Sequence, residues 1–462
     1  MVRLFKVFIP VGTLALLFSE CLLITGCFVL AAYLFLPEGP GVFFGAEGGV
    51  VGIALVVVAM VAGLYLNDLY SEVQVKSKIL LTQQLCFVMG SAFLLEAMVS
   101  YVDRNLRMPL HVMLPGGVIS LIGCYFWRIF FSAYALPAMG GERLLLVGGS
   151  PLVHEISQYA VNNPSTGLQV LGFVDDVGMA EAAGVPKYLG RLDSLREVAQ
   201  ATAPTRIVVG MRERRNRVPM ADLLDLRFSG HIVEEAAITY ERISGRVPIR
   251  ELRPSELIYS GDTVRIHRAL IYQNSINSIL AIVGLIVCFP FMLLTALAVR
   301  LTSAGPILYR QVRVGLNGKP FTLFKFRSMR VDAEAATGAV WAARDDPRVT
   351  TVGRIIRKVR LDELPQLFNV LKGEMAMVGP RPERPEFVKT LVEQIPYYRQ
   401  RHAVRPGITG WAQINYKYGE TLQDTMVKLE YDLYYIKHIS FSLDVYIMLQ
   451  TLKTMLLSRG SQ

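Results

Sequence analysis

Cysteine is scarce in this sequence, and no pattern typical of a disulfide-linked or zinc-binding fold is present. Five cysteines occur in 462 residues, all in apolar segments, and no two form a Cys-x-x-Cys pair. We therefore expect the cysteines to be small residues of the apolar core. Basic runs interleaved with aromatic residues are also absent, so the net charge of +10 does not indicate a nucleic-acid partner. The charge better fits the flanks of membrane spans and attraction to anionic lipid.

Charged residues are almost missing from four long stretches near the N-terminus. These stretches comprise residues 7–36, 49–66, 79–99 and 113–137. Each is near or above the ~20 residues that a helix needs to cross a bilayer. Residues 1–140 are therefore predicted to form a bundle of four transmembrane helices. The first stretch is far longer than the core of a signal peptide, and no small-x-small cleavage site follows it, which indicates an anchor.

The basic residues around these stretches predict their orientation. Arg3 and Lys6 precede the first stretch, and Lys76 and Lys78 lie in the second loop, whereas residues 37–48 contain neither Lys nor Arg. Positive charge gathers on the cytoplasmic side of spans. Both ends of the bundle are therefore expected in the cytoplasm.

Three charged residues, Glu20, Glu96 and Arg128, nevertheless lie within the predicted spans. They indicate either a relay or substrate path, or pairing between helices and positions near the interface. We favour the second interpretation. A second copy of the bundle could supply partners for these groups, so a homodimer is also predicted.

Residues 141–262 alternate between strand-like and helix-like segments. Residues 143–147, 170–174, 206–209 and 231–234 have the apolar character of buried strands. This alternation predicts a Rossmann-like domain with a parallel, doubly wound sheet. The first strand ends in Gly148-Gly149-Ser150, but the turn lacks a complete Gly-x-Gly-x-x-Gly motif. A structural or degenerate nucleotide-binding role is therefore favoured over redox chemistry. A linker is expected at 250–262.

Residues 279–299 are almost uniformly apolar, with Pro290 near their centre. Their length suits a fifth span, but a fifth span would move everything after it out of the cytoplasm. Proline removes an amide donor and clashes with the preceding helical turn, so a sharp kink is expected. We predict a re-entrant helix, broken at Pro290, that enters and leaves on one face. An ordinary kinked span is the alternative.

The densest set of phosphate-binding residue types lies after residue 305. Asp362 and Glu363 are adjacent, and Asp362 is well placed to cap a helix that contains Pro365 in its first turn and ends at Gly373. A helix N-terminus also favours phosphate. Taken alone, the pair would indicate simple capping.

Several cations accompany this pair. Alternation along a strand puts Lys325 and Arg327 on one face, which suits a diphosphate. A solvated strand face is the alternative. Arg354 and Arg357 lie one helical turn apart shortly before the acidic pair.

Two runs rich in glycine and proline then present further arginines. They are Gly373-Glu374-Met375-Ala376-Met377-Val378-Gly379-Pro380-Arg381-Pro382-Glu383 and Arg405-Pro406-Gly407-Ile408-Thr409-Gly410-Trp411-Ala412-Gln413-Ile414-Asn415. Rigid loops of this kind fix a guanidinium for bidentate phosphate contact. From about residue 275 onward, the chain resembles the catalytic domain of the bacterial sugar transferases, the monotopic polyprenol-phosphate phosphoglycosyltransferases. The upstream part resembles the long subclass, which includes undecaprenyl-phosphate galactose- and glucose-phosphate transferases, and it also looks like the exopolysaccharide members. One departure is Phe289 before Pro290, where the family often has serine.

The resemblance implies a reaction and a set of roles. The family transfers a sugar phosphate from a UDP-sugar to undecaprenyl phosphate, initiates exopolysaccharide, O-antigen or capsule synthesis, and works at the bacterial inner membrane. Asp362 would be the nucleophile, Glu363 its support, and both would hold Mg²⁺. An ionised carboxylate needs no base. The expected substrate-binding residues are Lys325, Arg327, Arg354, Arg357, Arg381, Arg405 and Gln413.

The predicted catalytic part, residues 266–462, is an α+β domain that includes the re-entrant helix. A fragment starting near Ile266 is expected to retain the chemistry. Residues 443–457 are predicted to form an interfacial or core helix. A membrane-bound nucleotide-sugar dehydratase would need Tyr-x-x-x-Lys, which occurs nowhere in the chain. A non-catalytic scaffold is the other rival, but the intact Asp362-Glu363 pair argues against it.

Overall fold

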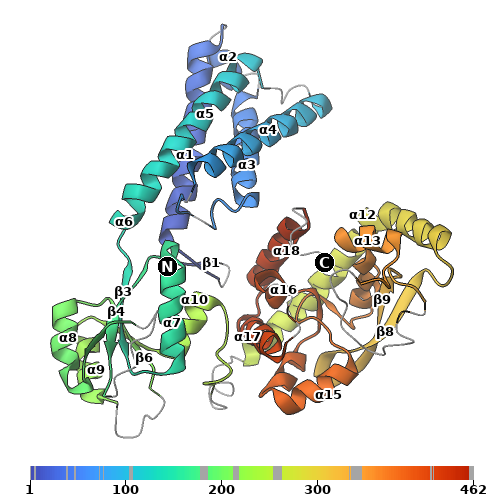
Figure 1. Cartoon of the computed structure of the whole chain (residues 1–462). Coiled ribbons are helices and arrows are strands. Elements are labelled where there is room, and N and C mark those ends of the chain that lie inside the picture. Colours follow the sequence, from blue (N-terminus) through green and yellow to red (C-terminus); the bar gives the residue numbers. More distant parts are fainter. Residues whose placement is uncertain are drawn as a thin grey trace. The chain divides into compact units, whose positions relative to one another are not determined.

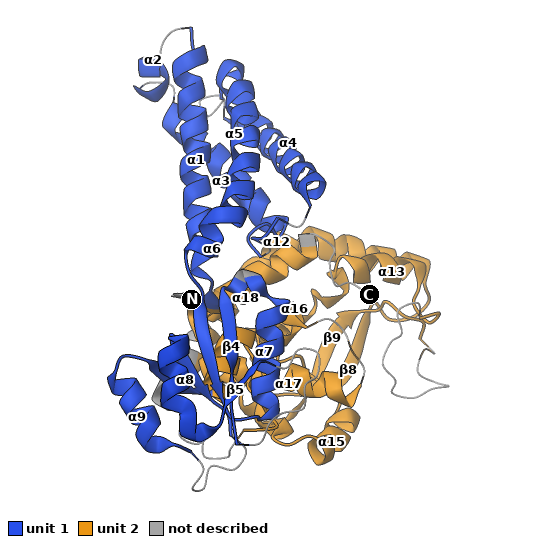
Figure 2. Ribbon diagram, turned by 60° about the vertical axis from the view of Figure 1, so that its left-hand side comes forward, with its two compact units in different colours: residues 1–4, 8–235 blue, residues 5–7, 236–462 orange. Residues whose placement is uncertain are grey.

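The computed structural model describes most of the chain. Its described residues are 2–4, 7–37, 40–45, 48–71, 73–75, 77–103, 108–176, 186–211, 218–252, 263–331, 333, 346–416, 419 and 421–456. Two short strands, β1 (Val2–Leu4) and β2 (Val7–Ile9), open the chain. The chain divides into two compact units, residues 1–4 with 8–235 and residues 5–7 with 236–462 (Figure 2). Lys6, Lys76 and most of the predicted linker lie outside the described residues.

Long helices near the N-terminus form the predicted bundle (Figure 1). They are α1 (Val11–Phe35), α3 (Gly49–Leu66), α4 (Lys78–Val102) and α5 (Leu110–Phe130), with a short α2 (Pro40–Gly45). A π-helical turn at Phe131–Ala135 leads from α5 into α6 (Leu136–Ala138). Helix α1 packs against α3 and α5, and α4 packs against the same two helices. Each of the four predicted spans is therefore a helix of this bundle.

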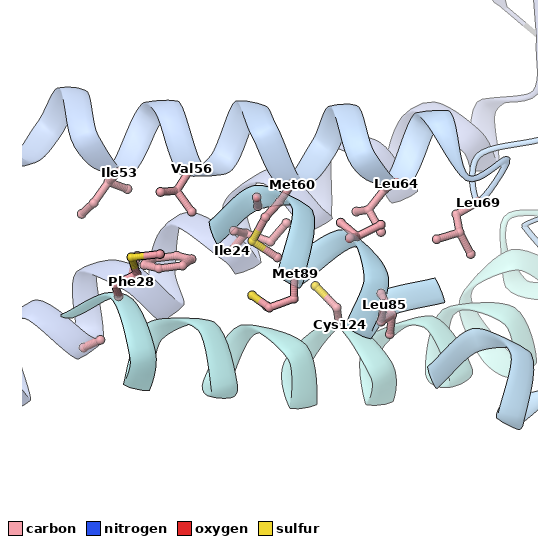
Figure 3. Packing of buried hydrophobic residues seen from close by; sticks show 14 of the residues in the cluster. Ile24, Phe28, Ile53, Val56, Met60, Leu64, Leu69, Leu85, Met89 and Cys124 are labelled. Atoms are coloured by element: carbon pink, nitrogen blue, oxygen red, sulfur yellow. The ribbon is translucent and has the colours of Figure 1, made fainter. Parts of the chain in front are cut away.

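Apolar side chains and close helix contacts fill the bundle. Figure 3 shows Phe28, Ile53, Val56, Met60 and Met89 pointing toward one another. Glycines allow the helices to approach closely. A Cβ on Gly116 would lie 2.6 Å from the ring of Phe28, and one on Gly63 would lie 2.9 Å from Val88. Small residues at helix contacts are typical of membrane bundles, because packing drives association there.

The charged residues of the spans find partners inside the same bundle. Arg128 holds the carboxylate of Glu20 with Nε at 2.6 Å and Nη2 at 2.9 Å, and its Nη1 donates to the carbonyl oxygen of Leu69 at 2.9 Å. Glu96 accepts from Ser100 and from the amide of Met108. The predicted pairing between helices is thus confirmed for Glu20 and Arg128. It occurs within one chain, so these residues give no reason to expect a second copy.

The α/β domain has the predicted parallel sheet. Its strands are β3 (Glu142–Val147), β4 (Leu168–Val174), β5 (Tyr188–Gly190), β6 (Arg206–Val209) and β7 (Ile232–Glu235), in the order β5-β4-β3-β6-β7. Its helices are α7 (Pro151–Asn162), α8 (Leu195–Thr202) and α9 (Met220–Phe228), with 3₁₀ turns at Pro164–Thr166 and Leu192–Ser194. All neighbouring strands are parallel, and the order is that of a doubly wound fold.

Two backbone amides of the glycine turn after β3 form hydrogen bonds within the sheet domain. The amide of Gly148 donates to the carbonyl oxygen of Val174 at 2.8 Å, and that of Ser150 donates to Gly210 at 3.2 Å. Gly148 has a φ of +91°, and a Cβ there would lie 2.6 Å from the carbonyl oxygen of Gly210. These two amides are therefore engaged in the sheet edge, which favours the predicted structural role.

The second unit contains every motif that is predicted to take part in catalysis. Its helices are α10 (Ala236–Ser244), α12 (Thr263–Thr302), α13 (Thr351–Lys358), α14 (Gln366–Leu371), α15 (Pro385–Gln394), α16 (Trp411–Asn415), α17 (Leu422–His438) and α18 (Phe441–Leu456). Antiparallel β8 (Leu308–Val314) and β9 (Pro320–Phe326) form one ribbon, and parallel β10 (Ala376–Val378) and β11 (Gly407–Thr409) form another. The remaining 3₁₀ turns are Leu316–Gly318, Leu361–Glu363 and Tyr398–Ala403.

The core of this unit begins upstream of the predicted boundary at 266. Val247 and Ile249 are buried in one cluster with Leu429, Leu433 and other residues of α17. The indole Nε1 of Trp411 donates to the carbonyl oxygen of Gly245 at 2.8 Å. Residues 236–252 are thus structural parts of the catalytic unit.

Helix α12 packs against the catalytic unit on both sides of Pro290. Ala281 and Leu285 lie against a cluster that includes Leu367, and Val299 is buried against Phe326 and Ile356. Isoleucine, valine, leucine and phenylalanine side chains on its other faces are exposed. The helix continues through Pro290 as one element, so the chain is not interrupted there as predicted, and the re-entrant path stays a prediction. Proline removes one amide donor, and the hydrogen-bond ladder resumes beyond it, with Thr295 Oγ1 also donating to the Phe291 carbonyl at 2.7 Å.

By length and composition, five helices among the described residues are apolar enough to cross a membrane. Four belong to the bundle and the fifth is Gln273–Thr302 within α12. The predicted helix near the C-terminus is α18. Leu443 and Ile447 are buried against the unit, and the apolar side chains of Leu449 and Leu452 are exposed.

Candidate active site

The acidic pair lies in a short 3₁₀ turn rather than at a helix cap. Arg360 adopts the left-handed conformation, with φ at +57°, and turns the chain directly before Leu361–Glu363. Helix α14 then begins after Pro365, and no side chain caps it. The predicted capping by Asp362 is therefore wrong, because the turn ends before α14 begins. Gly373, with φ at +73°, follows the end of α14 as predicted.

Glu363 is surrounded by three cations. Its Oε1 lies 2.8 Å from Lys325 Nζ and 2.9 Å from Arg381 Nη2, and its Oε2 lies 3.6 Å from Arg360 Nη1. Burial alone would raise the pKa of this carboxyl, but the charges of Lys325, Arg381 and Arg360 hold it well below its usual range. Glu363 is therefore a fixed anion that gathers positive charge beside its neighbour.

Asp362 has a different environment. The side chain is 7% exposed, and among the described residues its carboxylate accepts no hydrogen bond. Burial raises its pKa to about 6; Glu363 acts in the same direction, whereas Lys325, Arg357 and Arg381 oppose the shift. At pH 7 the group is mainly ionised. It combines negative charge with oxygens that accept no hydrogen bond from the described residues, as a nucleophile requires.

The structure brings some of the predicted cations to this pair. Lys325 and Arg381 contact Glu363 directly, and Arg357 acts on Asp362 through its charge. Arg354, on the same helix as Arg357, is exposed. Its contribution to the site remains a prediction.

Arg327 has other partners. Its Nη2 donates to the carbonyl and hydroxyl oxygens of Ser303, both at 2.7 Å, next to the end of α12. The side chain is buried, and β9 ends at Phe326. In this arrangement, Arg327 ties the end of the helix to the end of the strand that carries Lys325.

Arg405 and Gln413 also have contacts within the unit. Arg405 donates to the side chain of Asn274 on α12, and the Gln413 amide donates to the carbonyl oxygen of Ile408 at 3.2 Å. Buried atoms of both side chains, Nε of Arg405 and Oε1 of Gln413, have no partner among the described residues. Their predicted contact with substrate is untested by these distances.

Arg381 is presented by a loop whose carbonyl groups are all bonded. The oxygen of Pro380 accepts from the Gly407 amide, that of Arg381 from Arg401, that of Pro382 from Arg313, and that of Glu383 from the Val314 amide. The four distances lie between 2.9 and 3.0 Å. Together with the prolines, these bonds confirm the predicted rigid loop.

Sequence reasoning missed the buried polar residues that support the site. Asn369 on α14 donates to the Thr322 carbonyl at 2.7 Å and accepts from the Phe324 amide at 3.1 Å, so it fixes β9 beside α14. Arg401 and Arg313 hold the loop of Arg381. No local motif marks these residues, because their partners are distant in sequence.

A pocket lies between α12, β10 and α18. It is lined by Gln273, Asn277 and Leu280 of α12, Val378 of β10, and Asp444 and Met448 of α18, and its empty volume is about 330 Å³, part of it open to solvent. Burial raises the pKa of Asp444 to about 6, against the hydrogen bonds from Tyr435 and Gln273.

The donor set fits a magnesium ion only in combination with substrate. No group of three potential ligands from His, Cys, Asp and Glu occurs among the described residues. Asp362 and Glu363 supply two adjacent carboxylates, and Mg²⁺ is commonly held by one or two carboxylates together with phosphate oxygens and water. The oxygens of Asp362, which accept no hydrogen bond from the described part of the chain, meet that requirement.

Known proteins are similar to this chain over the residues that form the site. Residues 268–458 match the model of a family described as bacterial sugar transferase. A UDP-glucose:undecaprenyl-phosphate glucose-1-phosphate transferase of Xanthomonas campestris pv. campestris is 34% identical over 354 residues, which is 73% of this chain and 71% of the relative. A transferase of the same name from Escherichia coli (strain K12) is 36% identical over 319 residues, 67% of each chain.

A third relative extends the range of sugars. The UDP-N-acetylgalactosamine-undecaprenyl-phosphate N-acetylgalactosaminephosphotransferase of Aeromonas hydrophila is 42% identical over 222 residues. That match covers 48% of this chain and about half, 52%, of the relative.

Proposed function

This chain belongs to the bacterial sugar transferase family, and on that premise we propose that it transfers a sugar 1-phosphate from a UDP-sugar to undecaprenyl phosphate. The observation that carries the proposal is the contrast within the acidic pair. Glu363 is held by three cations, whereas Asp362 accepts no hydrogen bond from the described residues.

The reaction proceeds in two displacements. An Asp362 carboxylate oxygen attacks the β-phosphorus of the UDP-sugar, the bond from that phosphorus to the bridging oxygen breaks, and UMP leaves with the electron pair. A phosphate oxygen of undecaprenyl phosphate then attacks the phosphorus of the phosphosugar-enzyme, and the bond to Asp362 breaks. Undecaprenyl-diphosphate-sugar is released, and the carboxylate is regenerated.

The surrounding residues have electrostatic roles. Lys325 and Arg381 lie close enough to Asp362 to affect its pKa, which supports a role for both in binding the donor diphosphate and stabilising charge that develops on it. Arg357 adds to this positive field. Mg²⁺ held by Asp362 and Glu363 would offset charge on the diphosphate and on UMP.

The packing of α12 supports a re-entrant rather than a spanning helix. Ala281 and Val299 are both buried against one globular unit. They are 18 residues apart, which is roughly 27 Å in a straight helix, nearly the thickness of the bilayer core. A spanning helix could not have the same polar unit packed beside it at both faces of the bilayer core. The catalytic unit then lies on the cytoplasmic face of the bacterial inner membrane.

A homodimer is a separate part of the proposal. Its remaining support is that a catalytic unit fixed by one shallow helix would gain a more stable pose from pairing. Mass measurement of the full chain in native-like lipid particles tests it. A monomer with full activity would reject it.

The decisive experiment for the function uses the purified full chain in lipid nanodiscs that contain undecaprenyl phosphate. UDP-glucose and UDP-N-acetylgalactosamine are supplied in turn, since relatives are named for both sugars. UMP release with formation of a lipid-linked diphosphate sugar is expected with one of them. No UMP release from any UDP-sugar would reject the proposed function.

A further inference from the structure

We propose that Arg401 and its counter-ion Asp432 are positioning residues that fix Arg381 against Glu363. The inference deepens the proposed function and rests on it. It begins from a buried ion pair that the transfer reaction itself does not use. Arg401 is 7% exposed and Asp432 is 2% exposed. Their groups lie in the 3₁₀ turn Tyr398–Ala403 and in α17.

Every nitrogen of the Arg401 guanidinium is engaged. Nε and Nη2 donate to Asp432 Oδ2 at 3.2 and 2.9 Å, and Nη1 donates to the Tyr398 hydroxyl at 2.7 Å. Nη2 also donates to the main-chain carbonyl oxygen of Arg381 at 3.0 Å. A planar fork with fixed donor directions can hold three partners in one geometry, which lysine cannot do.

This carbonyl belongs to the residue whose side chain reaches the acidic pair. Arg381 Nη2 lies 2.9 Å from Glu363 Oε1. The buried ion pair is therefore bonded directly to the main chain of the residue whose guanidinium contacts Glu363. The bonds to the carbonyls of Pro380, Pro382 and Glu383 fix the loop on either side, and the Arg401 bond fixes the position from which the Arg381 side chain projects.

Stability alone does not account for this pair. A buried ion pair loses much of its Coulomb attraction to desolvation, and apolar residues of similar volume often replace it without loss of stability. What apolar residues cannot replace is the donor to the Arg381 carbonyl. The consequence is a loop free to shift, and small displacements of a charged group cost transition-state stabilisation.

The main test is the double variant Arg401→Met/Asp432→Leu in the full chain. We expect its melting temperature to stay near that of the wild type, while kcat/KM for UMP release falls about 10- to 100-fold. The matched control is Glu241→Gln/Lys437→Met, which removes another partly buried ion pair of 2.7 Å in the same unit. That variant should keep wild-type kinetics. Equal kinetic losses in both variants, or none in the first, would overturn the inference.

A double-mutant cycle separates positioning from general damage. In an Arg381→Ala background, removal of the Arg401–Asp432 pair should lower kcat/KM less than about twofold, because the side chain to be positioned is gone. Full additivity of the two losses would reject the proposal. Arg401→Lys keeps a charge opposite Asp432 but loses the fork. Should the double variant fail to fold, Arg401→Lys is the test. A loss of kcat/KM is expected for this variant, and wild-type kinetics would contradict the inference.

Failure of the inference and failure of the proposed function give different results. A wild-type protein that releases UMP, with a double variant that does so equally well, rejects only the positioning role. A wild-type protein that releases no UMP from any UDP-sugar rejects the function. The affinity for UDP-glucose, measured by calorimetry, then reports the Arg401 effect, and an unchanged affinity in the double variant rejects that role too.

Discussion

Two adjacent carboxylates acquire different properties from their immediate neighbours. Glu363 is held by Lys325, Arg381 and Arg360, and the pKa of its carboxyl lies well below its usual range. Asp362 is buried with its oxygens uncommitted to the described residues, and its pKa is raised to about 6. Adjacency in sequence therefore does not imply equal roles, and substitution of each residue should have a distinct effect.

Asp362→Asn should abolish transfer, with a fall in kcat on the order of 10³-fold or more, because an amide cannot form the acyl-phosphate bond to the phosphosugar. Glu363→Gln should lower kcat about 10- to 100-fold and retain some adduct, because the cations lose part of their anchor. Mass spectrometry after incubation with UDP-sugar measures the adduct. Turnover near wild type in Asp362→Asn would rule out the nucleophile, and an unchanged rate in Glu363→Gln would rule out its support.

Asp444 offers a test of stability against pH. Its pKa is raised from 3.8 to about 6, chiefly by burial, so folding is favoured while the group is neutral. That contribution is lost as pH rises through 6, which amounts to roughly 1–2 kcal/mol between pH 5 and pH 8. The stability of Asp444→Asn, measured relative to the wild type, should therefore be higher at pH 8 than at pH 5. Melting temperatures at both pH values measure this, and parallel curves would contradict it.

Among the elements, α12 is the one for which the sequence and the packing favour different membrane topologies. Its length and hydropathy match those of a span. Its packing does not, because both halves lie against the same unit. We therefore keep the proposal that α12 does not cross the membrane, since a polar unit beside the helix cannot enter the bilayer core.

Cysteine labelling tests this orientation. Ser275 and Thr302 are exposed near the two ends of the apolar part of α12. In a chain without native cysteines, Ser275→Cys and Thr302→Cys should both escape an impermeant maleimide added to intact cells and both react after permeabilisation. Gly41→Cys, in the predicted outer loop, is the positive control. Reaction of Thr302→Cys from outside would establish a fifth span.

At the scale of the whole molecule, the catalytic unit starts earlier than its motifs suggest. Residues 236–252 supply Val247 and Ile249 to its core and the acceptor for the Trp411 indole. The expectation that a fragment from Ile266 onward would suffice is therefore revised. Every chemical motif is present in such a fragment, but part of the core is not.

A fragment of residues 236–462 should fold in detergent and release UMP, whereas one of residues 266–462 should melt at a markedly lower temperature. The loss of each buried aliphatic side chain removes about 1.5–3 kcal/mol. Thermal melts and UMP release measure the two fragments side by side. Equal melting temperatures would show that residues 236–252 are dispensable for stability.

The sequence by itself determined the long helices, the parallel sheet, the acidic pair and the rigid loop of Arg381. Each depends on local signals: hydrophobic runs, alternation, and glycine or proline at fixed positions. Tertiary structure alone decided which groups meet. It paired Glu20 with Arg128, gave Arg327 to the end of α12, placed Asp362 in a turn before α14, and joined Arg401 to Asp432. Such contacts join residues that local patterns do not connect, because burial and charge at a site depend on the whole packed unit.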